Sequence, residues 1–165
     1  MIKVARFLNS LWILILSAVL IGAYIYEITT DQHPCPLCLL QRIAMISVGF
    51  GACLNLRYGI KAIHYALSLI SSSFGASVSL RQISLHVCPQ FPSFGFPVFG
   101  LELFTWAFIV FGCSAIGLSF LLYIYREEHE IPRMNFLEKA VIYILFILSL
   151  GNVITTFMDC GFSFC

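Results

Sequence analysis

The stretch LNSLWILILSAVLIGAYIYEI, residues 8–28, is apolar along nearly its whole length and carries a single charged residue, Glu27, near its end. A helix needs about 20 predominantly apolar residues to cross the hydrocarbon core of a bilayer, so this stretch predicts a membrane-spanning helix. The chain contains four further apolar stretches of similar length: 39–56, 62–80, 100–125 and 136–158. We therefore expect an all-α membrane protein with five spanning helices.

The composition predicts one integral membrane domain over residues 1–165. Hydrophobic residues make up 60% of the chain and charged residues only 10%, with a mean hydropathy of +0.95, whereas soluble domains carry about 25% charged residues. The first apolar stretch exceeds the roughly 7–15 residues of a signal-peptide core, so we expect it to be retained as an anchor. The net charge of +1 gives no indication of nucleic-acid binding.

The basic residues predict the orientation of the helices. Most of them fall at the same ends of the predicted helices: Lys3, Arg6, Arg57, Lys61, Arg126, Arg133 and Lys139. Because positive charges concentrate on the cytoplasmic side of membrane proteins, we expect these ends to be cytoplasmic. The N-terminus would then be cytoplasmic, and five crossings would place the C-terminus on the outer, periplasmic side.

Most of the cysteines are predicted to share the outer side of the membrane: Cys35, Cys38, Cys88, Cys160 and Cys165. Disulfides persist in that compartment, so these five are candidates for redox or structural bonds. The other two, Cys53 and Cys113, lie within predicted helices. Buried cysteine behaves as a small apolar residue, and we expect these two to serve packing.

Cys35-Pro36-Leu37-Cys38 forms a Cys-x-x-Cys pair at the outer start of the second apolar stretch. A structural disulfide across so few residues would stabilise the chain little. A zinc site would need about four ligands, and no second pair of this kind is present. Leu39 occupies the position that histidine takes in a c-type haem motif. A dithiol that exchanges disulfides is favoured, with zinc and a passive staple as the alternatives.

The neighbours of this pair favour a reactive thiolate. Pro34 and Pro36 stiffen the loop and bias it away from helix, which would hold the sulfurs where the second helix begins. Cys38 would then lie near that helix's N-terminus, where unpaired N–H groups stabilise an anion. Arg42 lies one turn further along and adds positive charge on the same face. An arginine just inside a membrane is costly and indicates function, with snorkelling toward the headgroups as the alternative. The pattern predicts a thiolate beside a cation, at a depth that a quinone head group could reach.

Three motifs resemble one family of membrane proteins. CPLCLLQR, residues 35–42, resembles the motif that the DsbB family of disulfide-generating proteins carries between its first two helices. RQISL, residues 81–85, is similar to that family's stretch near its quinone, and FGLELFTW, residues 99–106, is similar to the start of its fourth helix. The resemblance covers residues 8–125.

The DsbB resemblance implies a four-helix core in a bacterial inner membrane. Such a protein reoxidises a soluble, periplasmic DsbA-like protein of thioredoxin fold and transfers the electrons to ubiquinone or menaquinone. The resemblance also implies that Cys38 contacts the quinone as a thiolate and that Arg42 stabilises the reduced state. Gln82, together with Arg81 and His86, would complete the head-group site, with a general interfacial role as the alternative for these three.

The chain departs from the DsbB pattern in its second cysteine pair. The family carries that pair between helices three and four, where this chain has only Cys88. A fifth apolar stretch and a tail, residues 136–165, instead add Cys160 and Cys165. Cys88 could pair with either of these two, but we favour Cys160–Cys165, because its closure is local and a chain end can meet a partner. A tail that only anchors in the interface is the alternative.

A second class of function stays open from the sequence. The chain could be a non-catalytic or metal-binding membrane subunit whose cysteines serve structure. That class predicts no dependence on quinone and a metal that remains bound during purification.

Overall fold

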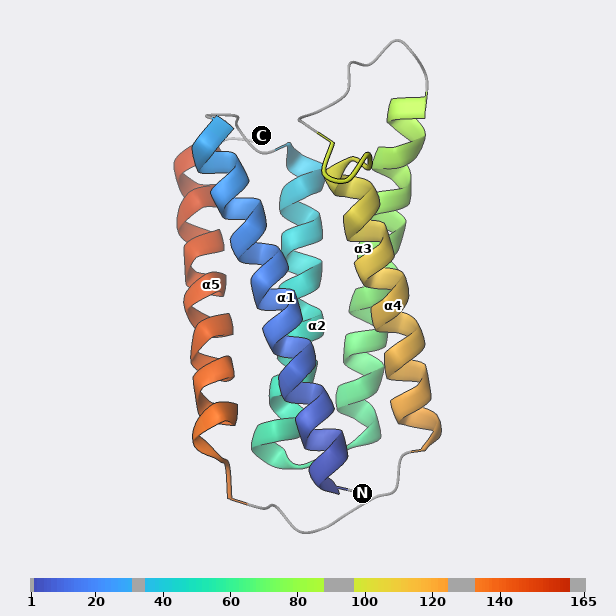
Figure 1. The fold of residues 1–165 in the computed structure, drawn as a ribbon, viewed down its shortest axis with the longest axis vertical. Helices are drawn as coiled ribbons and strands as arrows, with labels where there is room; N and C mark the ends of the chain where they lie inside the picture. The colour runs from blue at the N-terminus through green and yellow to red at the C-terminus, as the bar shows by residue number, and fades with distance from the viewer. Residues whose placement is uncertain (1, 31–34, 88–96, 125–132, 161–165) are drawn as a thin grey trace.

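The computed structural model describes residues 2–30, 35–87, 97–124 and 133–160. Its helices are α1 (Ile2–Thr30), α2 (Pro36–Tyr58), α3 (Ala62–Val87), α4 (Leu103–Tyr123) and α5 (Phe136–Cys160). Within these ranges the only β-type pairing is an isolated bridge between Val98 and Leu101. The prediction of an all-α protein is confirmed. Successive helices run in opposite directions, and α4 and α5 lie at opposite edges of the bundle (Figure 1).

Among the described residues, four helices are long and apolar enough to cross a membrane: Lys3–Thr29, Pro36–Tyr58, Leu103–Tyr123 and Phe136–Phe157. The remaining predicted span, residues 62–80 within α3, is less apolar than the other four because α3 is rich in serine. Two of its buried serines bond across helix interfaces, Ser68 Oγ to the Val48 carbonyl at 3.0 Å and Ser72 Oγ to the Phe111 carbonyl at 2.7 Å. The polarity of α3 is therefore partly satisfied by its neighbours α2 and α4.

Several helix boundaries differ from the predicted ones, and two of the differences lie near the dithiol end of the bundle. α3 continues beyond residue 80 to Val87, so Gln82 and His86 lie on the helix. His86 Nδ1 lies 2.9 Å from the Gln82 carbonyl oxygen, one helical turn away. α4 begins at Leu103 rather than at residue 100, because Phe99 and Gly100 adopt positive φ values of 52° and 80° and form a turn.

The helices pack around α2, which contacts each of the other four. α3 packs between α2 and α4, and α5 packs against α1 and α2 on the other side (Figure 1). α1 and α4 pack on different sides of this arrangement without an extensive contact between them. Cys53 packs against the hydrophobic core as expected, whereas Cys113 is exposed on α4. The packing role expected for Cys113 was wrong, because its side chain points away from the other helices.

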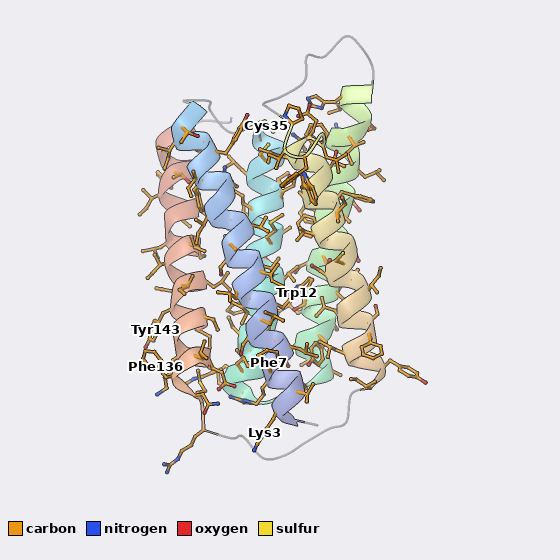
Figure 2. The ribbon with its side chains drawn as sticks, in the orientation of Figure 1. Lys3, Phe7, Trp12, Cys35, Phe136 and Tyr143 are labelled. Carbon is orange, nitrogen blue, oxygen red and sulfur yellow. The ribbon has the colours of Figure 1, made fainter. Side chains whose placement is uncertain are left out.

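A buried ion pair joins α5 to α1 at the end of the bundle that holds the N-terminus. Arg6 Nε lies 2.8 Å from Glu138 Oε1, and Arg6 Nη2 lies 2.6 Å from Glu138 Oε2. Glu138 Oε2 also accepts a hydrogen bond from the Asn135 backbone N–H at 2.8 Å, which satisfies a donor just before α5. Figure 2 shows Lys3, Phe7 and Phe136 at this end and Cys35 at the opposite end.

Candidate functional site

Cys35 caps the N-terminus of α2. Its backbone is extended, with φ −70° and ψ 153°, and Pro36 follows at the first helical position. The Cys35 sulfur accepts a hydrogen bond from the Cys38 backbone N–H at 3.2 Å, so the first turn of α2 solvates that sulfur. The sequence prediction that the pair lies at the start of this helix is confirmed.

The two sulfurs are in contact as free cysteines, with Cys35 Sγ and Cys38 Sγ 2.7 Å apart. The hydrogen bond from the Cys38 thiol lowers the pKa of Cys35 from 9.0 to about 6, against the opposing effect of burial. The backbone N–H groups of Cys38 and Leu37 act in the same direction. The first turn of α2 therefore favours the ionised form of Cys35.

A pair of glutamines completes the sulfur environment from α2 and α3. Gln82 Nε2 lies 3.5 Å from both Cys35 Sγ and Cys38 Sγ. Gln41 Nε2 donates to Gln82 Oε1 at 2.8 Å, which turns the NH₂ end of Gln82 toward the sulfurs. Gln82 is 2% exposed. Its amide is therefore a fixed donor beside the dithiol.

Arg42 lies one turn beyond Cys38 and is held from α1. Arg42 Nη2 lies 2.5 Å from Glu27 Oε2, and the guanidinium carbon lies 4.8 Å above the Tyr24 ring. Arg42 is 7% exposed. The alternative in which this arginine snorkels to the headgroups is wrong, because the ion pair and the ring retain it inside the bundle.

A cavity of about 340 Å³ opens beside Cys38, between α1 and α4, with α2 along one wall. Its volume lies in the range of about 300–1,000 Å³ that small-molecule sites occupy. The lining is mostly apolar, with five polar or charged side chains among it: Glu27, Cys38, Gln41, Arg42 and Gln82. Aromatic residues line it as well: Tyr26, Phe104 and Trp106. The arrangement suits a flat, mostly apolar molecule with a few hydrogen-bond acceptors.

Four of the predicted site residues lie at the cavity, and a fifth lies behind its lining. Cys38, Arg42 and Gln82 line the cavity, and Cys35 contacts Cys38 at its edge. His86 stacks on the Phe104 ring with centroids 4.8 Å apart, behind the lining.

The remaining predicted residues lie away from the cavity or beyond the described structure. Arg81 is exposed and is not among the lining residues. Cys88 and Cys165 lie outside the described residues, and Cys160 is the last residue of α5, with its side chain outside the description.

Sequence reasoning did not assign Gln41 or the aromatic lining to the site, and it named Glu27 only as a proton carrier for a reduced quinone, with a general interfacial role as the alternative. Gln41 lies within the motif of residues 35–42, so the motif itself was a usable signal. Glu27 and Phe104 reach the cavity from separate helices. Their contribution depends on how α1 and α4 pack around α2, which a single sequence does not encode locally.

Comparison with known proteins identifies the class to which this fold and site belong. The chain matches the family model described as disulfide bond formation protein DsbB over residues 5–121. Disulfide bond formation protein B of Pseudomonas syringae pv. tomato is 32% identical over 147 residues, covering 67% of this chain and 85% of that protein. The chain belongs to the DsbB family of membrane disulfide bond formation proteins.

Other relatives match over shorter segments. Disulfide bond formation protein B of Cupriavidus metallidurans is 30% identical over 82 residues, covering 48% of this chain and 51% of that protein. The protein of the same name from Albidiferax ferrireducens is 38% identical over 71 residues, covering 41% of this chain and 40% of that protein. The chain thus spans about half, or less, of the length of these two relatives. No solved structure gives a significant match.

Proposed function

We propose that this protein is a quinone-linked thiol oxidase, which reoxidises a soluble DsbA-like protein and transfers the electrons to a membrane quinone. One observation carries the proposal. Cys38 belongs to the dithiol and lines the apolar cavity beside two hydrogen-bond donors, Gln82 and Arg42. A thiol that exchanges disulfides in water is thereby placed against a site for an apolar molecule.

The cavity lining fits a quinone head group. Quinone carbonyls accept hydrogen bonds, and Arg42 Nη1 is buried without a hydrogen-bond partner among the described residues, which normally requires a partner from a ligand or water. Aromatic and aliphatic side chains supply flat apolar walls, among them Phe104 and Trp106. A bound quinone would act as the electron acceptor, taking two electrons and two protons as the dithiol becomes a disulfide.

The chain's own residues define an order of events at the pair. Cys35 lies at the outer cap of α2, whereas Cys38 lines the cavity. An incoming thiolate that attacks Cys35 of the disulfide forms a mixed disulfide and releases Cys38 as the leaving thiolate. Cys38 is then the free sulfur on the cavity side, next to Gln82 and Arg42. A second thiol of the partner then attacks the mixed disulfide, which releases the partner as a disulfide and leaves Cys35 and Cys38 as the reduced pair that a bound quinone would reoxidise.

The proposed orientation places the dithiol on the periplasmic face of an inner membrane. Basic residues gather at the opposite end of the bundle, in keeping with the positive-inside rule. They include Lys3, Arg57 and Lys61. α3 would be a fifth crossing, because the chain must return between α2 and α4, and its buried serines bond to carbonyls of those helices. Cys38 would then meet the quinone pool of the membrane and Cys35 a soluble partner.

The experiment that tests the function is a quinone-reduction assay. The purified full chain in detergent is mixed with a reduced thioredoxin-fold thiol protein, and loss of quinone absorbance is followed with a ubiquinone and with a menaquinone analogue. We expect catalytic turnover with at least one quinone and none when the partner is omitted or the oxidase is first alkylated. Absence of turnover with both quinones, from folded protein and a reduced partner, would contradict the proposal.

We further propose that the tail cysteines, Cys160 and Cys165, form the second redox pair. α5 ends at the same end of the bundle at which α2 begins (Figure 1), so a tail following Cys160 starts on the side of the dithiol. Replacing both tail cysteines by serine should slow oxidation of the protein partner by more than about tenfold. Oxidation of a small thiol such as dithiothreitol, which can attack Cys35 directly, should be affected little.

The matched control for the tail is Cys88→Ser. If the tail variant oxidises the protein partner at the wild-type rate, the tail assignment is wrong. If Cys88→Ser is as slow as the tail variant, the second pair includes Cys88.

A further inference from the structure

Two charged side chains lie inside the candidate cavity, Arg42 from α2 and Glu27 from α1. Their side chains are only 8% and 16% exposed, and Arg42 Nη2 lies 2.5 Å from Glu27 Oε2. An isolated charge at this depth would be costly. Glu27 therefore supplies the charge that lets Arg42 remain inside the bundle.

The contacts of Arg42 fix its direction as well as its charge. The Tyr24 ring lies 4.8 Å from the guanidinium carbon, and the Glu27 carboxylate contacts Nη2. Arg42 Nη1 is buried and has no hydrogen-bond partner among the described residues. One edge of the guanidinium is thus occupied by the protein, while another nitrogen stays available at the cavity.

We propose that Glu27 is a positioning residue for Arg42: its carboxylate holds the guanidinium at the cavity wall and cancels its charge, so that Cys38 faces an ion pair rather than a bare cation. The inference rests on the proposed function in taking Cys38 as the thiol that acts in the cavity. It goes beyond that function because it names Glu27, a residue of α1, as the group that limits how strongly Arg42 stabilises an anion at Cys38.

The physical consequence concerns the resting thiol. A bare cation near a thiol favours its ionised form, commonly by tenfold or more. With the carboxylate of Glu27 against the guanidinium, the two charges largely offset each other in the cavity, so Arg42 favours a thiolate at Cys38 less than a lone cation would. Glu27 thereby keeps Cys38 unreactive toward adventitious electrophiles between turnovers.

Few other ionisable groups in the described structure face this ion pair. Tyr24 and Tyr26 do so from α1, and Cys35 contacts Cys38 from the cap of α2. α3 contributes the neutral Gln82 to the lining, while its His86 stacks on Phe104. α4 contributes no ionisable side chain to the lining, although its cap residue, Glu102, lies next to the lining residue Leu103. The described part of α5 contributes no ionisable side chain to the lining either.

The test measures the reactivity of Cys38 without quinone or partner. In a Cys35→Ser background, the rate of alkylation of Cys38 by iodoacetamide at pH 7 is followed by peptide mass spectrometry, which separates it from the other cysteines. Glu27→Gln keeps an oxygen acceptor for Arg42 but removes the charge, so alkylation should accelerate roughly tenfold. Glu27→Asp keeps the charge and should restore the background rate. Glu27→Ala frees the guanidinium from the cavity wall and should accelerate alkylation less than Glu27→Gln.

Arg42 must mediate the effect if the inference is correct. Arg42→Gln leaves Glu27 as an uncompensated anion and should slow alkylation roughly tenfold, whereas Glu27→Gln combined with Arg42→Gln should return the rate to near the background value. Glu102→Gln, which removes a carboxylate outside the cavity lining, is the matched control and should leave the rate unchanged.

Two results would overturn the inference. One is an unchanged rate in Glu27→Gln with helicity retained, and the other is an acceleration that persists after Arg42 is replaced. If Glu27→Gln does not fold, the Arg42→Gln and Glu27→Asp variants still test the inference. An unchanged rate of Cys38 alkylation in Arg42→Gln would mean that the charge of Arg42 does not act on Cys38. None of these results depends on turnover, so a failure here is distinct from a failure of the quinone-reduction assay.

Discussion

A Cys38→Ser variant is expected to lose partner-driven quinone reduction by more than about a thousandfold, the scale on which enzymes lose activity when a nucleophile is removed. Serine is nearly the same size as cysteine but forms no disulfide, so the pair can neither receive electrons by exchange nor release them at the cavity. The remaining thiol at Cys35 has no disulfide to offer a reduced partner, and it could form a mixed disulfide only by attacking the disulfide of an oxidised partner. Quinone absorbance after mixing with the reduced partner measures the effect.

The matched control is Cys53→Ser in the same helix. Cys53 packs against the core on the far part of α2, away from the cavity lining, so its replacement should leave turnover within about twofold of the wild type. A folded Cys38→Ser protein that retains more than a tenth of the wild-type rate would contradict the assignment of Cys38. Trapping of an oxidised partner on Cys35 in this variant, seen as a mixed disulfide on a non-reducing gel, would independently support the order of attack.

The local part of the site could be predicted from the sequence, because it depends on helix periodicity. Cys38 and Arg42 are four residues apart, so a helix beginning near Pro36 places both on one face, and both line the cavity. Cys35 at the cap follows from the proline and from the start of the apolar stretch. These relations hold for any isolated helix of this sequence, and they needed no knowledge of the packing.

The contacts between helices could not be predicted in the same way. Gln41 and Gln82 are 41 residues apart in the chain, and their hydrogen bond exists because α2 and α3 pack closely. The partner of Arg42 could have come from several helices, and only the position of α1 selects Glu27. The serine-rich stretch of α3 was predicted to be tolerated where helices pack together, but its particular partners, the Val48 and Phe111 carbonyls, depend on how α2 and α4 lie against it.

The Glu138→Ala variant is expected to lose about 3–5 kcal/mol of stability, the range found when one partner of a buried ion pair is removed. Both Arg6 and Glu138 are 6% exposed, and two hydrogen bonds join them. Without the carboxylate, the guanidinium is left buried and uncompensated, and the Asn135 N–H loses its acceptor. The change weakens the junction between α5 and α1, on which the placement of α5 and its tail depends.

The free energy of unfolding in mixed detergent micelles, followed by far-UV circular dichroism, measures this effect. Lys139→Ala is the matched control, because Lys139 is the next residue of α5 and is exposed; its loss should change stability by less than about 0.5 kcal/mol. Replacing both partners by apolar residues, Arg6→Met with Glu138→Leu, should recover most of the loss, because no charge is then left buried without a partner. Equal stabilities for Glu138→Ala and Lys139→Ala would mean that the ion pair does not hold α5 to the bundle.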